Sequence, residues 1–151
     1  MPGIRTYPLL STDDSDWLHM RVALWPEGSA REHVKEMAGF LTEPDRFAQF
    51  VVRDDEGAAL GFIEASVRTD DVNGTSTSPV AYLEGLYVRP KARRQGVARA
   101  LVQAVAHWAR GRGCEELASD ALLSNRTSQA AHKGLGFAET ERVVHFNLRL
   151  G

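Results

Sequence analysis

The chain has 151 residues, of which 43% are hydrophobic and 25% are charged, and its formal net charge is −2. This composition excludes a disordered or fibrous protein, and the nearly balanced charge argues against a protein that binds nucleic acid. No apolar stretch approaches the roughly 18 residues of a membrane span, so we expect one cytoplasmic domain over residues 1–151 without a membrane partner.

The first half of the chain predicts a strand, two helices and a hairpin. A short strand is expected at residues 4–8, and a helix that Pro26 ends should follow it. The helical spacing of this first helix is carried by Trp17, Met20, Arg21 and Leu24. A second amphipathic helix fits residues 30–41. Its expected buried face comprises Val34, Met37, Ala38 and Leu41. Residues 47–68 predict a hairpin around a turn at residues 54–57.

The second half alternates strands and helices. A loop with an Asn73-Gly74 turn signal precedes a strand at residues 80–88. A helix then follows, with Gly111 or Gly113 as its end. Its apolar spacing is Val97, Leu101, Val105 and Trp108. Residues 114–121 predict a strand, residues from about 125 to 135 a short helix, and residues 141–150 a final strand. The order predicts the α/β class, with a mixed sheet and helices on both faces.

The stretch "RPKARRQGVARALV", residues 89–102, indicates a site for a diphosphate. A helix N-terminus carries unpaired N–H groups and about half a positive charge, which attract anions. Gly96 and Ala98 allow a ligand close to the backbone, and Arg93 and Arg94 add full charges. No Gly-Lys-Ser/Thr follows, which excludes a Walker A loop. The alternative is a basic surface turn that begins a helix.

These residues resemble the pyrophosphate loop of the GCN5-related N-acetyltransferase (GNAT) superfamily. A second match supports the resemblance, because Asn125, Ser128, His132 and Gly136-Phe137 keep the spacing of another signature of that superfamily. The resemblance covers nearly the whole chain. It implies the GNAT fold, whose mostly antiparallel central sheet contains one splayed parallel pair, and Glu84-Gly85 is a plausible bulge for the splay.

The same resemblance implies that the protein binds acetyl-CoA as cosubstrate. The backbone of the strand would pair with the pantetheine arm, the loop would hold the pyrophosphate, and Asn125 would lie near the thioester. The implied cofactor-binding residues are Leu86, Tyr87, Val88, Arg93, Arg94, Gly96, Val97, Ala98 and Asn125. The alternative role for Asn125 is a helix N-cap.

Acidic residues at the strand ends indicate a cationic substrate. Glu84 interrupts an apolar strand, where an unpaired carboxylate is costly. It could form a salt bridge with Arg68 or Arg142, or it could join other acids around a substrate that carries several ammonium groups. The other candidate acids are Asp70, Asp71, Asp120, Glu139 and Glu141.

A closer resemblance rests on "ALWP", "VNGTSTSP", "YLEGLYV", "ASD" and "GFAETERV". These segments are similar to the aminoglycoside 6′-N-acetyltransferases of the small chromosomal type, which acetylate and inactivate antibiotics. The substrate-binding residues implied by this resemblance are Trp25, Glu84, Asp120 and Glu141. Asp71 stands where the family often has an aromatic residue, and we place it in the substrate mouth on charge grounds. Trp25 could alternatively be part of the core.

The resemblance also implies direct transfer of the acetyl group to the 6′-amine. Glu84 or Asp120 would accept the amine proton as the catalytic residue, and the N–H of Val88 would polarise the thioester carbonyl. His132 replaces the usual tyrosine of the superfamily. It could protonate the departing thiolate or favour the end of its helix. The single Cys114 is expected to pack rather than act as a nucleophile.

Two other functions remain compatible with the sequence. The chain could acetylate another small polyamine or a protein amine, or it could bind acyl-CoA without catalysis. The apolar run in residues 141–150 would leave an open strand edge, which is usually covered, so a homodimer is expected.

Overall fold

A computed structural model describes residues 3–151 of the chain. These residues form one five-stranded sheet and four α-helices. The strands are β1 (Ile4–Pro8), β2 (Phe47–Asp54), β3 (Ala59–Arg68), β4 (Val80–Val88) and β5 (Leu117–Ala118). The helices are α1 (Ser15–Leu24), α2 (Ala30–Leu41), α3 (Val97–Gly111) and α4 (Arg126–Gly134), with a 3₁₀ turn, η1 (Pro90–Ala92), before α3.

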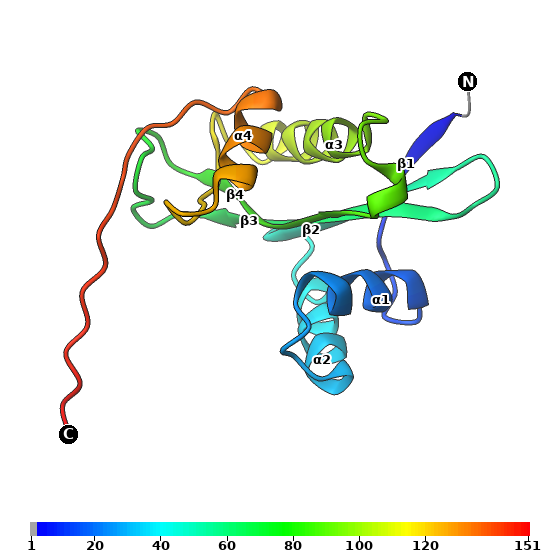
Figure 1. The fold of residues 1–151 in the computed structure, drawn as a ribbon, viewed down its shortest axis with the longest axis horizontal. Helices are drawn as coiled ribbons and strands as arrows, with labels where there is room; N and C mark the ends of the chain where they lie inside the picture. The colour runs from blue at the N-terminus through cyan, green and yellow to red at the C-terminus, as the bar shows by residue number, and fades with distance from the viewer. Residues whose placement is uncertain (1–2) are drawn as a thin grey trace.

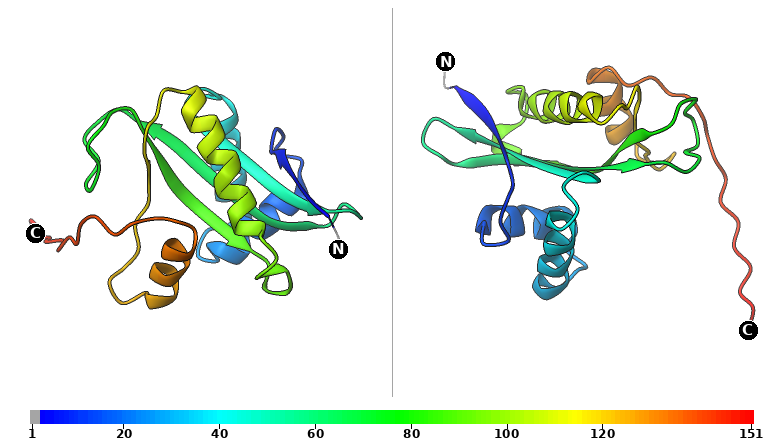
Figure 2. Two further views of the ribbon diagram at one scale, coloured as in Figure 1. Left: turned by 90° about the horizontal axis from the view of Figure 1, so that it is seen from above. Right: turned by 180° about the vertical axis from the view of Figure 1, so that it is seen from behind.

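The sheet has the strand order β1-β2-β3-β4-β5. The pairs β1–β2, β2–β3 and β3–β4 are antiparallel, whereas the pair β4–β5 is parallel. Helices α1 and α2 cover one face of the sheet, and α3 and α4 cover the other (Figures 1 and 2). The expected mixed α/β class with helices on both faces is therefore confirmed.

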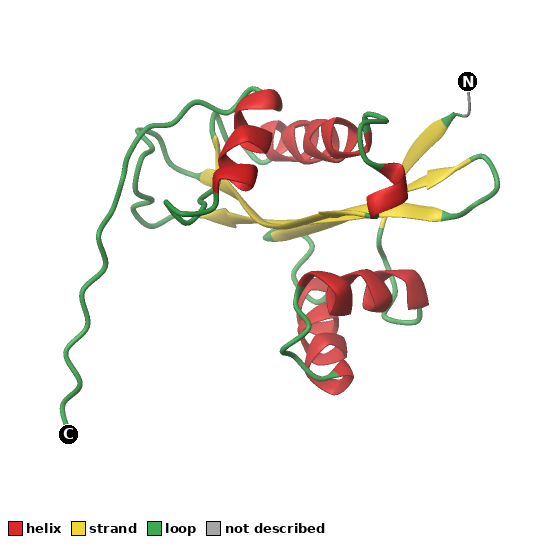
Figure 3. Ribbon diagram, in the orientation of Figure 1, coloured by secondary structure: helices red, strands yellow, loops and turns green. Residues whose placement is uncertain are grey.

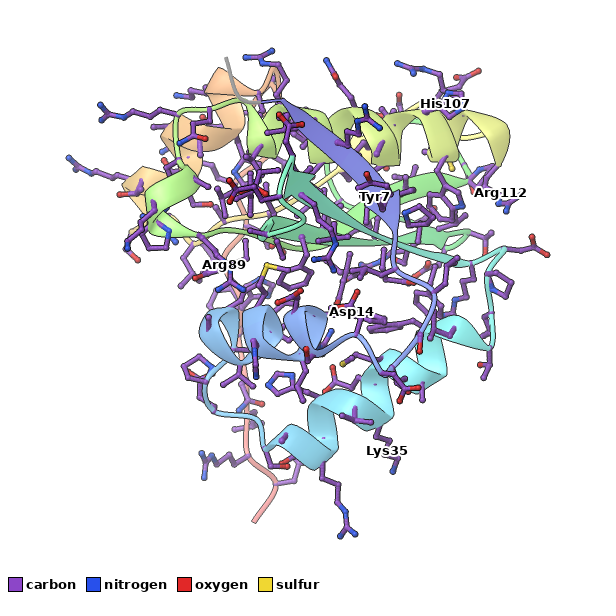
Figure 4. The ribbon with its side chains drawn as sticks, turned by 90° about the vertical axis from the view of Figure 1, so that its right-hand side faces the viewer. Tyr7, Asp14, Lys35, Arg89, His107 and Arg112 are labelled. Carbon is purple, nitrogen blue, oxygen red and sulfur yellow. The ribbon has the colours of Figure 1, made fainter. Side chains whose placement is uncertain are left out.

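Local capping explains where the first two helices begin. The Asp14 side chain accepts hydrogen bonds from the first turn of α1 and pairs with Arg53 of β2 at 3.1 Å. Asp14 lies between the sheet and α1 (Figure 4). Ser29 and Glu32 form a capping box at the start of α2. Among the expected core residues of α2, Met37 is buried but Ala38 is exposed, and His33 is buried instead.

Two hydrophobic clusters lie on opposite faces of the sheet. The cluster under α1 and α2 contains Trp17, Met20, Met37 and Phe62, all buried. The cluster under α3 contains the apolar stripe that the sequence predicts. Its buried members include Val52, Ile63, Val97, Leu101 and Val105. The sheet is therefore held from both sides, with β3 in its middle and β4 between β3 and the short edge strand β5.

A buried ion pair crosses the α1 side of the sheet. Arg21 of α1 and Glu64 of β3 expose only 1% and 3% of their side chains and meet at 2.5 Å. The indole N–H of Trp17 donates to the same carboxylate at 2.8 Å. Burial raises the pKa of Glu64, and the Arg21 charge opposes that rise. The second Arg21 partner, Glu36, is 2.6 Å away but is 57% exposed.

The last part of the chain differs from its prediction. The strand expected at residues 114–121 shrinks to Leu117–Ala118, and residues 141–150 form no strand. They leave the body of the protein as an extended segment (Figure 3). Its exposed apolar side chains are Val143, Val144, Phe146, Leu148 and Leu150. The expected final strand is wrong for the single chain, because no strand within residues 3–151 lies beside this segment to complete its backbone hydrogen bonds.

No helix within residues 3–151 is long and apolar enough to cross a membrane.

The buried ion pair predicts unequal effects of its two carboxylates on stability. Glu64→Leu leaves the Arg21 charge buried without its inner partner, so we expect the free energy of unfolding to fall by about 3–5 kcal/mol. Glu36→Leu is the matched control, and its effect should stay within about 1 kcal/mol because Glu36 is exposed. Urea unfolding measures both values, and equal losses would contradict the prediction.

Candidate active site

The middle of β4 contains a bulge at Glu84. Glu64 of β3 pairs with Gly85, whereas the next residue of β3, Ala65, pairs with Leu83, so Glu84 is the extra residue. A bulge of this kind bends the strand and turns two successive residues toward one face. Here that face carries α1 and α2, because Glu84 contacts Ser66, two residues beyond Glu64 on β3. The bulge expected at Glu84-Gly85 is therefore present.

Trp25 lies against the bulge, at the end of α1. A Cβ atom at Gly85 would come within 2.6 Å of the Trp25 ring atom Cζ2, so only glycine allows this approach. The Arg21 guanidinium lies 4.8 Å from the Trp25 ring centroid. His33 accepts from Arg21 through Nδ1 and contacts the Trp25 carbonyl through Nε2, at 3.1 Å and 3.0 Å. Trp25 is only partly buried, so the core supports a ring that also faces solvent.

Glu84 is held by two neighbours on β3. Its carboxylate accepts from Ser66 at 2.7 Å and from Arg68 at 2.8 Å, and 34% of its side chain is exposed. Of the two expected ion pairs, the one with Arg68 forms, whereas Arg142 pairs with Glu139. Glu84 is thus paired and partly exposed. The buried carboxylate of the sheet is Glu64, which stands in an equally apolar stretch of sequence and which no local feature of the sequence singles out.

Tyr82 and Asp120 extend this polar group along β4. Tyr82 pairs with Ala118 of β5, and Asp120 follows two residues later. Burial, together with the hydrogen bond to Asp120, raises the pKa of Tyr82 to about 12, so the phenol stays protonated and donates to the carboxylate. The Arg68 guanidinium lies 3.7 Å from the centroid of the Tyr82 ring. Glu84 and Asp120 are thus connected through Arg68 and Tyr82.

The other two candidate acids lie on exposed segments. Asp71 belongs to the loop between β3 and β4, and Glu141 belongs to the C-terminal segment. Gly74 of the loop faces Thr140, so the loop and the beginning of the segment lie together. Glu116, just before β5, accepts from the hydroxyl of Thr77 and from the backbone N–H groups of Ser76 and Thr77 in this loop, and these hydrogen bonds lower its pKa. Neither Asp71 nor Glu141 forms an ion pair among the described residues.

The basic turn between η1 and α3 borders a pocket of about 310 Å³. The lining residues are Val88, Ala92, Arg93, Arg94, Gly96, Val97, Ala98, Arg99 and Leu135. Gly96 precedes the helix with φ 81°, Arg94 has φ 64°, and no side chain caps the first turn of α3. The N–H groups of this 15-residue helix are therefore open to an anion beside three arginines.

The outer edge of β4 runs between the carboxylates of Glu84 and Asp120 and the basic turn that precedes α3. Pairing with β5 ends at Tyr82 and Ala118, so residues 83–88 have no strand partner on that side among the described residues. A ligand with amide groups can use such an edge as a further strand would. Asn125 caps α4 by accepting from the N–H of Ser128 at 3.0 Å, which is its expected alternative role. Cys114 is buried, and burial raises the pKa of its thiol, in line with a packing role.

A second hydrogen-bonded group lies where β4 and β5 separate. Ser119, the first residue after β5, places Oγ 2.7 Å from Nε2 of His132 on α4. Nδ1 of His132 lies 2.7 Å from the backbone carbonyl of Ser128. The spacing of the sequence motif indicates His132 but not Ser119, because nothing local in "LASDA" indicates a histidine partner 13 residues away.

The chain matches the model of the Acetyltransferase (GNAT) family over residues 14–137. It is 50% identical over 135 residues to an aminoglycoside N(6′)-acetyltransferase type 1 of Serratia marcescens, covering 89% of this chain and 92% of that protein. A protein of the same name from Acinetobacter baumannii is 46% identical over 95% of this chain and 97% of its own length.

Solved structures agree with the sequence matches. The crystal structure of an aminoglycoside 6′-N-acetyltransferase from Acinetobacter baumannii has a TM-score of 0.91 and 45% identity, covering 99% of this chain and all of that one. The structure of AAC(6′)-Iy in complex with the bisubstrate analogue CoA-S-monomethyl-acetylneamine also has a TM-score of 0.91, with 39% identity over 97% of this chain and 99% of that one.

The contact between Gly85 and Trp25 can be tested by adding one methyl group. Gly85→Ala forces the indole away from β4, so we expect the unfolding free energy to fall by about 1–3 kcal/mol and tryptophan emission to shift to the red. Gly39→Ala is the control, because a Cβ at this position, in the last turn of α2, meets nothing within 4 Å. It should raise stability by about 0.5–1 kcal/mol. Unchanged emission from the Gly85 variant would show that Trp25 does not need the glycine.

Proposed function

This chain belongs to the GNAT acetyltransferase family, and we propose that it transfers the acetyl group of acetyl-CoA to the 6′-amine of an aminoglycoside antibiotic. The observation that carries this proposal is the arrangement of β4. One end of the strand meets a cationic turn, and its middle carries an aromatic ring and carboxylates on one face. Relatives that are 43–50% identical, named as aminoglycoside N(6′)-acetyltransferases, support the choice of substrate.

The residues around the basic turn fit the diphosphate of acetyl-CoA. Its lining gathers Arg93, Arg94 and Arg99 around the open helix N-terminus, and Gly96 keeps the backbone accessible. A diphosphate there meets full charges, free N–H groups and the helix dipole. The free edge of Leu86, Tyr87 and Val88 suits the amides of the pantetheine arm. A pantetheine arm that runs along this edge from the basic turn brings the thioester toward Glu84 and Asp120.

The substrate side suits a sugar that carries several ammonium groups. Trp25 offers an aromatic face, and Glu84, Asp120, Asp71 and Glu141 offer negative charge. A carboxylate–ammonium pair at 4 Å contributes about 4 kcal/mol at an effective dielectric constant of 20. Two or three such pairs therefore favour a multiply charged amine over a singly charged one. Asp71 and Glu141, on neighbouring exposed segments, would close over the substrate from the loop side.

The reaction requires a neutral amine. An ammonium with a pKa near 10 is neutral about once in a thousand molecules at pH 7, which costs roughly 4 kcal/mol. Asp120 is the better acceptor for the proton, because Glu84 already holds the Arg68 cation and the Ser66 hydroxyl. Among the residues that the structure describes, the partner of Asp120 is the phenol of Tyr82, which stays protonated. The amine then attacks the thioester carbonyl, and the N–H of Val88 stabilises the developing negative charge on oxygen.

We also propose that the protein works as a homodimer in the cytoplasm, where acetyl-CoA is available. The C-terminal segment supports the dimer, because Val144, Phe146, Leu148 and Leu150 are each at least 75% exposed and alternate along an extended chain. Alternating apolar residues are typical of a strand with one buried face. A second copy of the chain provides a sheet for this segment and buries its apolar side.

The position of acetylation can be tested with paired substrates. We expect thiol release from acetyl-CoA with aminoglycosides of the kanamycin type that carry a 6′-amine, and none above background with analogues that carry a 6′-hydroxyl. Asp120→Asn should lower kcat by about 100-fold or more, because the proton acceptor is lost. Asp13→Asn, at an exposed position ahead of α1, is the control and should leave the rate unchanged.

Equal turnover of the amine and the hydroxyl analogue would contradict the proposed position. Turnover only with other polyamines or peptides would favour a different acetyltransferase, and binding of acetyl-CoA without any turnover would favour a non-catalytic role.

If the C-terminal segment holds the homodimer together, changes in this segment should change the mass of the protein in solution. Analytical ultracentrifugation should give about twice the 16.6 kDa chain mass for the wild type. Removal of residues 143–151, or the double change Phe146→Asp and Leu148→Asp, should give a monomer. Leu10→Asp is the control, because Leu10 is 76% exposed but lies near β1. A monomeric wild type would refute the dimer.

A further inference from the structure

We propose that the hydroxyl of Ser119 donates the proton that the departing sulfur of coenzyme A needs, and that His132 supplies Ser119 with its replacement. This inference rests on the proposed function. It assigns a catalytic role to Ser119 and a supporting role to His132, whose ring stands behind the hydroxyl. Three observations carry it: the position of Ser119, the hydrogen-bond directions at His132, and the surroundings of the pair.

Ser119 occupies the point where the two parallel strands separate. The β4–β5 ladder ends with Tyr82 and Ala118, and Ser119 is the next residue. The free edge of β4 starts at the same level and runs toward the basic turn at its far end. A pantetheine arm that follows this edge from the turn ends beside Ser119 and Asp120. The hydroxyl therefore lies next to the place where the thioester and the amine must meet.

The backbone determines which nitrogen of His132 carries a hydrogen. The Ser128 carbonyl, 2.7 Å from Nδ1, can only accept, so Nδ1 is the donor. Nε2 is thereby directed at Oγ of Ser119, 2.7 Å away. In the neutral ring Nε2 accepts the hydroxyl proton of Ser119. In the imidazolium Nε2 donates instead, and the hydroxyl hydrogen of Ser119 becomes free to point at a ligand.

The surroundings hold the pair in place without competing for the proton. The rings of Phe137 and His132 pack in a T-shaped arrangement, with their centroids 5.2 Å apart. Ser119 and His132 are both partly buried. The adjacent carboxylate, Asp120, accepts from Tyr82. Asp120, which takes the amine proton, and Ser119, which protonates the sulfur, are therefore adjacent residues after β5.

The proposed step balances in atoms and charge. As the C–S bond breaks, its electron pair remains on sulfur, which takes the proton of the Ser119 hydroxyl and becomes the thiol of coenzyme A. Oγ of Ser119 takes the Nε2 proton of the His132 imidazolium, which leaves the ring neutral. Water then returns one proton to His132, and the carboxylate releases the amine proton to water. No acetyl group is attached to Ser119 at any stage.

Steady-state kinetics with acetyl-CoA and a kanamycin-type aminoglycoside test this role. Ser119→Ala should lower kcat by about 100-fold, the lower end of the usual range for general acids, because a thiolate is a good leaving group. The KM values and the affinity for coenzyme A measured by calorimetry should change less than twofold. Ser119→Thr keeps the hydroxyl and should retain most of the activity. His132→Gln should be as slow as Ser119→Ala, and the double variant no slower.

Other outcomes identify which idea fails. If Ser119 only attaches α4 to the sheet, Ser119→Ala will lower the melting temperature and weaken coenzyme A binding while kcat stays within threefold, and the inference is overturned. Mass spectrometry that finds an acetylated Ser119 during turnover overturns it as well. If the wild type shows no acetylation of the aminoglycoside, the proposed function fails first. Ser124→Ala, on the exposed turn before α4, is the matched control and should behave as wild type.

Discussion

The extra residue in β4 determines what each face and edge of this strand can do. Glu84 has no partner of its own in the β3 ladder, so the strand bends and presents Glu84 and Gly85 to the side of α1 and α2. Gly85 then leaves room for the Trp25 ring, and Glu84 meets Ser66 and Arg68. Two residues earlier the pairing with β5 ends, which frees the opposite edge for a ligand. The bulge is thus accompanied by side chains that gather on one face of β4 and by backbone groups that stay free along its outer edge.

The buried pair of Arg21 and Glu64 has a consequence for the surface as well as for the core. Burying both charges is expensive, and well-packed apolar side chains are often as stable. In this chain the same guanidinium lies over the Trp25 ring and receives support from His33. His33 also reaches the Trp25 carbonyl, so both the ring and the backbone of this residue are held from behind. The buried charges are costly, but they fix the orientation of the partly exposed Trp25 ring.

The sequence predicts those features that depend on neighbours along the chain. The periodicity of apolar residues correctly places α2 and α3, and the bulge is visible as a Glu-Gly pair inside an apolar strand. Features that depend on distant partners are missed. Glu64 and Glu84 look alike in sequence, and only the packing of Arg21 makes one of them the buried acid. Residues 141–150 have the pattern of a strand, but a strand also needs an adjacent strand, and the described part of the chain places none beside them.

The net charge of −2 conceals a separation of charge along β4. At one end Arg93, Arg94 and Arg99 surround a helix N-terminus, and at the other Glu84 and Asp120 lie with a single cation, Arg68, between them. Exposed charges are screened within about 8–10 Å at physiological salt, so each end acts on its own ligand with little interference from the other. An anionic cosubstrate and a cationic amine can therefore bind to the same strand at once. Their reacting groups meet in the middle, where the strand is bent and its edge is free.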